Sequence, residues 1–467
     1  MHATKIGLLF EIIFRNAALT GTQMIHHRFF DAGDGEGGRY AAAHRGQALP
    51  VNRRKDAMIE PYRGDFNARF TAETYAELLR KLDEQVGMHV EFRVAETPCF
   101  FAPELMERMV QAGVELTAQL LGNARYMAES KAAIPAEYCV PGLLMDGDAH
   151  PHFMTVDFGL VRDAGGELQP KLVEMQAFPS IFGYQPMLAK TYIEVYGLDR
   201  GLTYLFGGME EEAYWALMRE VIVGEHAPEN VVLAAVEPQT QRTLPDFVMH
   251  EKALGIKTVD VARLVKEGSR LFYRDERRGK LMPVERMYNR VIVDEVVRKN
   301  VVLPFDYRDD VQVEWAEHPN WYFQVSKFSV AHLRHETVPA AVFLDEWMAG
   351  MGRERLPEDR GQWVLKPLDS FAGKRIQVAP TDYEIAAIPA KERHQYLLQE
   401  RVKFEPVVRT PEGMTQAEIR ILYVWPDGGA MTPMTSLVRM GRGAMMGVDH
   451  HRDTTWVGGS VGLMPGR

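Results

Sequence analysis

The chain contains 467 residues, 46% of them hydrophobic and 25% charged, and its formal net charge is −10. These values are ordinary for a globular protein of roughly two to four domains. The acidic balance argues against nucleic acid or a membrane surface as a general partner, and no apolar run reaches the ~18 residues of a membrane span. The two cysteines, Cys99 and Cys139, provide no disulfide framework, so we expect a protein of the reducing cytoplasm.

Residues 1–57 show little hydrophobic periodicity and are rich in glycine and charge between 31 and 38. This pattern is typical of a disordered arm, or of an extension upstream of a later start codon at Met58. From Thr71 onward, apolar residues recur at three- and four-residue steps, which predicts helices. Thr71 is placed to cap the first helix and Pro103 to open the second.

Alternating apolar residues on both sides of a glycine-rich turn predict a β-hairpin over 153–177. Glu174 and Gln176 are two residues apart, so they share one face of their strand, and Asp157 lies on the partner strand. Two carboxylates and an amide oxygen on one sheet face are ligands that suit Mg²⁺. We therefore take Asp157, Glu174 and Gln176 as candidate metal ligands.

The next block, 228–300, alternates strand-like and helix-like runs. A strand–helix–strand–helix order predicts a parallel sheet with right-handed crossovers, in a small Rossmann-like domain. No G-x-G-x-x-G follows its first strand, so a dehydrogenase lacks its expected motif. The predicted elements are strands at 231–236, 256–259, 271–273 and 284–291 and helices at 243–254 and 261–267.

The C-terminal part alternates again, with strands expected at 321–325, 363–367, 375–378 and 396–402 and a strand pair at 417–425 and 434–440. A lysine on an edge strand is usually solvated. Lys366 differs because it ends an apolar strand that Pro367 cuts off, which favours contact with an anion such as phosphate. Lys327, at the end of another predicted strand, is a second candidate.

Two further groups of residues suit a nucleotide. Ser370, Gly373 and Lys374 form a loop that is able to cover a triphosphate, although the P-loop spacing is absent. In the run Leu397 to Val402, polar groups follow directly on apolar strand residues. Two carboxylates, Glu400 in this run and Glu405 just beyond it, suit an adenine amino group and ribose hydroxyls, the alternative being a solvated strand end.

Other catalytic motifs are missing from the sequence. His332 with His335, and His450 with His451, lack the H-E-x-x-H spacing of a zinc site, so we expect surface or structural histidines. There is also no G-x-S-x-G nucleophile motif of a hydrolase.

In the order of its segments over about 137–467, the chain resembles the circularly permuted ATP-grasp superfamily, which includes glutathionylspermidine synthase. Two departures are clear: Gln176 replaces the family's Asn, and the phosphate loop lacks its Gly-Arg-Glu-Gly form. The matching motifs are the acidic hairpin with Asp157 and Glu174-Met175-Gln176, the strand Tyr288-Asn289-Arg290, Lys327, Lys366-Pro367 with the phosphate loop Ser370 to Lys374, the hinge Gln399-Glu400-Arg401-Val402, which would take adenine, and the basic pair with Arg420 and Arg439 before Gly458-Gly459.

The resemblance implies a mixed α+β and α/β architecture, the permuted ATP-grasp fold, with ATP and Mg²⁺ as cofactors. It implies a C–N ligase that activates a small-molecule carboxylate as an acylphosphate and passes it to an amine. Arg290, Arg420 and Arg439 would hold the carboxylate and the phosphoryl group, unless they are surface ion-pair partners. A non-catalytic or regulatory ATP-binding protein and a phosphotransferase remain as alternatives. The implied divisions are 1–57, a helical region 58–136, a permuted segment 137–227, a Rossmann-like domain 228–300 and nucleotide-binding subdomains 301–467.

Overall fold

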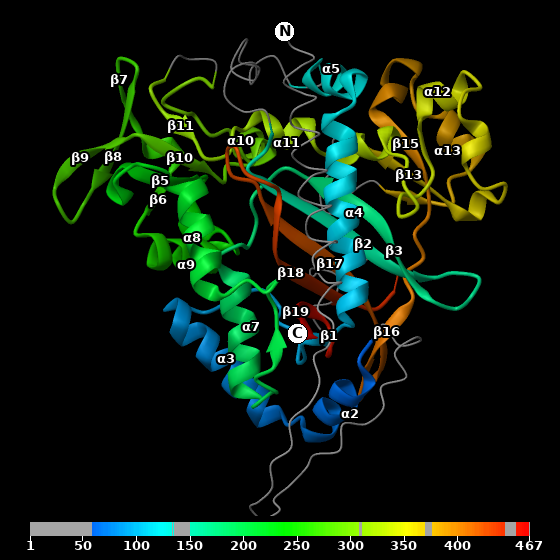
Figure 1. Ribbon diagram of the computed structural model, residues 1–467. Helices are drawn as coiled ribbons and strands as arrows, with labels where there is room; N and C mark the ends of the chain where they lie inside the picture. The colour runs from blue at the N-terminus through cyan, green and yellow to red at the C-terminus, as the bar shows by residue number, and fades with distance from the viewer. Residues whose placement is uncertain are drawn as a thin grey trace, which may run out of the picture. The chain divides into compact units, whose positions relative to one another are not determined.

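The computed structural model describes residues 58–132, 134, 150–307, 311–368, 376–443 and 454–466. These residues lie in one compact unit, Ala57–Arg467, which mixes helices with several sheets (Figure 1). Within the ranges just given, no helix has the length and apolar character needed to cross a membrane. The prediction for residues 1–57 concerns residues outside these ranges, as do the predictions for Ser370, Gly373, Lys374, His450 and His451.

The largest sheet gathers strands from distant parts of the chain. The predicted hairpin is confirmed: β2 and β3 pair antiparallel around a turn in which Asp163 Oδ1 accepts from the Gly165 and Glu167 amides, both at 2.9 Å. The predicted C-terminal strand pair, β17 with β18, is also confirmed. The sheet runs β1 (Cys99–Phe100), β19 (Gly458–Pro465), β18 (Thr432–Gly441), β17 (Gly413–Val424), β2 (Phe153–Arg162) and β3 (Leu168–Gln176), with β16 (Pro406–Thr410) on β17 and β4 (Leu202–Thr203) on β19.

Helices from the first half of the chain pack against this sheet. Thr71 caps α3 as expected, since its Oγ1 accepts from the Thr74 amide at 3.1 Å, and Pro103 stands in the first turn of α4. Helix α4 runs along the sheet (Figure 1), where the Tyr423 hydroxyl donates to the Val110 carbonyl at 2.9 Å. The helices are α2 (Glu60–Arg69), α3 (Ala72–Val86), α4 (Pro103–Leu121), α5 (Ala124–Ala132), α7 (Tyr184–Val195) and α8 (Glu211–Ile222).

The predicted parallel sheet is confirmed, in the order β11 (Glu314–Trp315), β10 (Arg286–Asn289), β5 (Val231–Ala235) and β6 (Lys257–Asp260). Helix α9 (Leu244–Leu254) follows β5 and ends as predicted at Gly255, which has a φ of 77°. Helix α10 (Val293–Lys299) follows β10, and the short 3-10 turns η1 (Pro228–Asn230) and η2 (Pro238–Thr240) flank β5.

Two predictions in this block are wrong. The expected helix at 261–267 is one turn, η3 (Val261–Arg263), followed by strand β7 (Val265–Glu267), because the Asp260 carboxylate holds only that turn through the Ala262 amide. The expected strand at 284–291 divides at Glu285, because β9 pairs antiparallel with β8 while β10 joins the parallel sheet. Strands β7, β8 (Arg270–Asp275) and β9 (Lys280–Val284) form their own antiparallel sheet.

The expected strand at 321–325 is instead helix α11 (Asn320–Gln324), followed by the 3-10 turn η4 (Lys327–His332). Pro319 precedes the helix, and the Asn320 amide donates to His318 Nδ1 at 3.2 Å, so the chain turns where an extended strand was expected. A short apolar and aromatic run has no periodicity that separates a buried strand from a buried helix.

A smaller antiparallel sheet completes the described residues, in the order β12 (Ala341–Phe343), β15 (Tyr396–Glu400), β13 (Trp363–Pro367) and β14 (Gln377–Val378). It has its own hydrophobic cluster, which includes Leu344, Trp363 and Leu398. Its short helical pieces are α12 (Leu344–Met348), η5 (Arg353–Arg355), η6 (Arg360–Gln362), α13 (Asp382–Ala386) and η7 (Ala390–Gln395).

Candidate functional site

The centre of the candidate site is Asp157, in the middle of β2. The register places it opposite Glu174 on β3 and opposite Arg420 on β17. Arg420 binds it with two parallel hydrogen bonds, Nε to Oδ1 at 2.6 Å and Nη2 to Oδ2 at 2.7 Å. Asp157 is buried, so this bidentate pair forms away from water, where charge-assisted hydrogen bonds are strong.

A second arginine, Arg439 of β18, extends the row of charges. Its Nη1 donates to Asp157 Oδ2 at 3.0 Å and also to the carboxylate of Glu418, its register partner on β17. Glu418 was not predicted as a site residue. The sequence held a signal, because Glu418 and Arg420 are two apart in an otherwise apolar strand and therefore share a face.

The predicted metal ligands lie together but are already engaged. Gln176 Nε2 donates to Glu174 Oε1 at 2.9 Å, so these two side chains share a face as expected. Both oxygens of Asp157 accept from guanidinium groups. The described part of the chain has no group of three or more Asp, Glu, His or Cys side chains able to hold a metal ion. This arrangement therefore does not fit Mg²⁺ directly, and the metal role of Asp157, Glu174 and Gln176 stays a prediction.

The charges on this face shift one another's pKa values. Burial would raise the pKa of Asp157, but Arg420 and Arg439 outweigh it and hold the pKa below its usual range. Burial raises the pKa of Glu418 despite the opposing charge of Arg439. The cluster thus keeps Asp157 ionised as a counter-ion for two arginines.

Lys366, on β13 of the smaller sheet, belongs to the same electrostatic cluster. Burial lowers the pKa of Lys366 to about 8; Glu174 and Glu418 oppose the shift, and Lys327 adds to it. Lys327 itself begins η4, just after Val325, whose carbonyl accepts from the Ala177 amide beside the end of β3 at 3.4 Å. The structure therefore brings both predicted lysines to the acidic hairpin.

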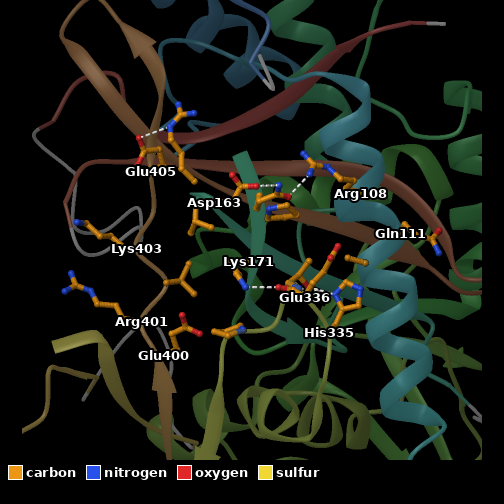
Figure 2. Close-up of a pocket in the computed structure, with 18 of the residues that line it drawn as sticks. Arg108, Gln111, Asp163, Lys171, His335, Glu336, Glu400, Arg401, Lys403 and Glu405 are labelled. Atoms are coloured by element: carbon orange, nitrogen blue, oxygen red, sulfur yellow. Dashed lines mark hydrogen bonds and ion pairs between the residues drawn. The ribbon is translucent and has the colours of Figure 1, made fainter. Parts of the chain in front are cut away.

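A groove of about 720 Å³ lies beside this face, between the hairpin, α4 and the segment after β15 (Figure 2). Its volume is within the range of ~300–1,000 Å³ for small-molecule sites. Glu400, Val402 and Glu405 line it, as the base and ribose prediction requires, while Gln399 is buried in β15.

Several polar residues of the groove already have partners. Glu400 accepts from the Ala340 amide at 3.1 Å, and Glu405 pairs with Arg162 at 3.1 Å. Lys171 donates to the Glu336 carbonyl at 2.7 Å (Figure 2). The two predicted carboxylates therefore shape the groove as well as line it.

Arg290 lies apart from the other two predicted arginines. It is buried at the end of β10, where its Nη1 pairs with Asp246 Oδ2 at 2.5 Å. Two histidines singled out in the sequence have carboxylate neighbours: His335, which lines the groove, has its Nε2 3.0 Å from Glu115, and His332 has its Nε2 3.4 Å from Glu129.

The comparisons with known proteins concern mainly the fold. No family model matches the chain. The structure is similar to that of a glutathione synthetase-like effector from Globodera pallida in its apo form, with a TM-score of 0.53 and 12% identity over 85% of this chain and 96% of that one. At this identity the similarity shows a shared fold, in keeping with the mixed α+β architecture.

Isoleucine–tRNA ligases are similar to part of the sequence. The identity is 27% over 237 residues for the Streptococcus agalactiae protein and 26% over 238 residues for that of Streptococcus pneumoniae. These matches cover 45% of this chain, which spans only 24% of the length of either tRNA ligase.

Proposed function

We propose that this protein is an ATP-dependent ligase of the circularly permuted ATP-grasp type, which joins a small-molecule carboxylate to an amine. The observation that supports this most directly is the convergence of cations from two sheets. Lys366 of the smaller sheet lies close enough to Glu174 and Glu418 for their charges to oppose the lowering of its pKa by burial. The same carboxylates pair with Arg420 and Arg439 of the larger sheet. The shared fold with a glutathione synthetase-like protein adds support.

In this proposal the adenine and ribose occupy the groove lined by Glu400, Val402 and Glu405, and the phosphates extend towards Lys327 and Lys366. Arg420 and Arg439 hold the substrate carboxylate and the migrating phosphoryl group, since a guanidinium binds either in bidentate fashion. This requires Asp157 to release donors that it now accepts from, so the substrate anion takes its place as their partner. These four cations stabilise the negative charge that develops on the transferring phosphoryl group in the transition state. The reaction therefore needs no covalent nucleophile from the protein.

The reaction balances in two displacements. A carboxylate oxygen attacks the γ-phosphorus and ADP leaves, which gives an acylphosphate. The amine nitrogen then attacks the acyl carbon, inorganic phosphate leaves, and the nitrogen loses a proton to give an amide. Mg²⁺ would enter the site bound to the phosphates of ATP. None of the steps above is assigned to it.

A second candidate is a nucleotide-binding protein without ligase activity. It is favoured by the pairing of Asp157 with both arginines, which leaves this carboxylate no free oxygen in the present arrangement. ADP release that depends on added acid and amine supports the ligase; ATP binding without such release supports the second candidate.

The test is a thermal melt with ATP and Mg²⁺, compared with NAD⁺ and Mg²⁺. A ligand at about 100 times its Kd stabilises the native state by ~2.7 kcal/mol, which is a visible rise in Tm. We expect this rise for the wild type and its loss in Lys366→Ala and Glu174→Ala. Lys391→Ala, which changes an exposed lysine of the same smaller sheet region, is the control and keeps the rise. No rise with millimolar ATP would contradict the proposal.

A further inference from the structure

The loop at 177–183 joins Gln176, at the end of the acidic strand, to helix α7. It is held by Asp246, which lies on α9 beside the parallel sheet. Asp246 Oδ1 accepts from the amides of Gly183 at 2.7 Å and Tyr184 at 3.0 Å, and Oδ2 accepts from that of Ile181 at 3.2 Å. Helix α7 has no side-chain cap from its own N-terminal residue. Asp246 therefore supplies the missing cap from another part of the fold.

Arg290 completes the arrangement. Its Nη1 pairs with Asp246 Oδ2 at 2.5 Å, and its guanidinium stands over the rings of Phe178 at 5.7 Å and Phe247 at 4.9 Å. The side chains of Arg290 and Asp246 are 3% and 0% exposed. A guanidinium covered in this way presents no open edge to a substrate carboxylate.

The loop is held in a conformation that it would not adopt by itself. Ile181 has a φ of 60°, in the left-handed region, which is strained for a β-branched residue. Gly183 lies so close to α9 that a Cβ there would be 2.7 Å from His250 Nδ1 and 2.9 Å from the Asp246 carbonyl oxygen. Surrounding contacts must impose such a conformation. Asp246 holds the amide of the strained Ile181, and the Gln185 amide of α7 donates to the Ile181 carbonyl at 3.2 Å.

The same loop contacts the segment that leads to Lys327. The Phe178 ring packs edge-on against Tyr322 of α11 at 5.6 Å, and the Ala177 amide donates to the Val325 carbonyl at 3.4 Å. A shift of the loop would therefore displace the end of β3, with Glu174 and Gln176, and the start of η4 together.

We propose that Asp246 and Arg290 form a clamp that positions the loop at 177–183, and through it the acidic strand and Lys327, so that Arg290 acts on the reaction without touching substrate. This inference rests on the proposed function and assigns Arg290 a positioning role in place of a catalytic one.

The test is a double-mutant cycle on ATP turnover, measured as phosphate release, with Asp246→Asn, Arg290→Gln and the double variant. We expect each single variant to lower kcat by about 100-fold, with an unchanged KM for ATP, because a small misplacement of reacting groups costs that much. If Arg290 acts only through the clamp, the double variant loses no more than the worse single variant. Arg290→Lys keeps a cation beside Asp246 and should recover part of the lost kcat. This variant separates the loss of the ion pair from a failure to fold.

Losses of kcat that multiply in the double variant would give Arg290 its own contact with substrate and overturn the inference. A raised KM for ATP with unchanged kcat would do the same, because a positioning role predicts the opposite split.

Hydrogen exchange at the amides of Ile181, Gly183 and Tyr184 tests the clamp without using activity. We expect exchange at least about tenfold faster at one or more of these amides in Asp246→Asn, because the side chain then has one acceptor oxygen where the carboxylate had two. Arg286→Gln is the matched control, since Arg286 lies on the same strand but pairs with Glu314 at 2.7 Å. Unchanged exchange in Asp246→Asn would overturn the clamp. Absence of ATP turnover in the wild type would instead overturn the proposed function, and the exchange result would still decide whether the clamp exists.

Discussion

Lys366 is a cation of the candidate site whose charge changes near neutral pH. Burial lowers its pKa to about 8, below the ordinary 10.5, whereas guanidinium groups stay charged over the whole working range. At pH 7 the Lys366 ammonium is mostly protonated and suits a phosphate. At pH 9 it is mostly neutral.

We therefore predict that ATP affinity falls as the pH rises through about 8. The expected loss of affinity between pH 7 and pH 9 is about tenfold, because the protonated fraction of Lys366 falls by about that factor. Calorimetric titration with ATP, repeated at pH values from about 6.5 to about 9.5, measures this change in Kd. Lys366→Arg, which keeps its charge, should bind ATP with little change over this range, and an equal pH dependence in that variant would assign the titration to another group.

The pairing of Asp157 with two arginines also has a consequence for metal binding. Because Arg439 neutralises Asp157 and Glu418, we predict that Mg²⁺ without nucleotide stabilises the wild type little. In Arg439→Gln both carboxylates lose that partner, so Mg²⁺ should stabilise the variant, by about 1.4 kcal/mol at ten times its Kd. Thermal melts with MgCl2 against NaCl at equal ionic strength make the comparison.

Arg442→Gln is the control for this prediction, because Arg442 lies just after β18 but has Glu412 as its carboxylate neighbour, at 3.8 Å. Equal effects of Mg²⁺ on the wild type and on Arg439→Gln would show that the arginine does not limit access of the metal ion.

At the same scale, the sequence predicted one part of the site. Strand alternation and a local hairpin were enough to predict that Asp157, Glu174 and Gln176 lie together, because residues two apart share a face. The pairing of β17 with β2, which brings Arg420 to Asp157, joins distant parts of the chain, and only the family resemblance had singled out Arg420 and Arg439. Strand alternation was not enough for Arg290. A strand-end arginine pairs with whichever carboxylate the tertiary packing supplies, and Asp246 lies on a helix whose placement the local pattern does not fix.

Elements with explicit start and stop signals were predicted best. Thr71, Pro103 and Gly255 each mark an end of a helix through a local physical requirement: a side-chain cap, a missing amide hydrogen and a left-handed φ. The short runs at 261–267 and 321–325 carry no such signal within them. Residues just before each run start the turn instead: the Asp260 carboxylate holds the Ala262 amide, and His318 Nδ1 holds the Asn320 amide.

For the whole compact unit, the arrangement of sheets could not be read from the sequence. The largest sheet takes strands from three separated stretches, and β1 pairs with β19 across almost the whole described length. The smaller sheet with Lys366 has its own hydrophobic cluster, and it connects to the larger sheet through the segment at 401–405. There the Glu405 amide donates to the Leu160 carbonyl at 2.8 Å. A nucleotide that spans the groove and Lys366 would therefore contact both sheets.

We predict from this arrangement that ATP protects the connecting segment from trypsin. Arg401 and Lys403 are exposed and line the groove (Figure 2), so cleavage after them reports directly on its occupancy. Cleavage should slow about tenfold with ATP and Mg²⁺ near 10 Kd, since only the unoccupied fraction remains open. Cleavage after Arg277 and Arg278, in the turn between β8 and β9, should not change, and Lys366→Ala should lose the protection at equal ATP. Protection at all of these sites alike would instead mean that ATP inhibits the protease or stabilises the chain globally, and that the groove is not where the nucleotide binds.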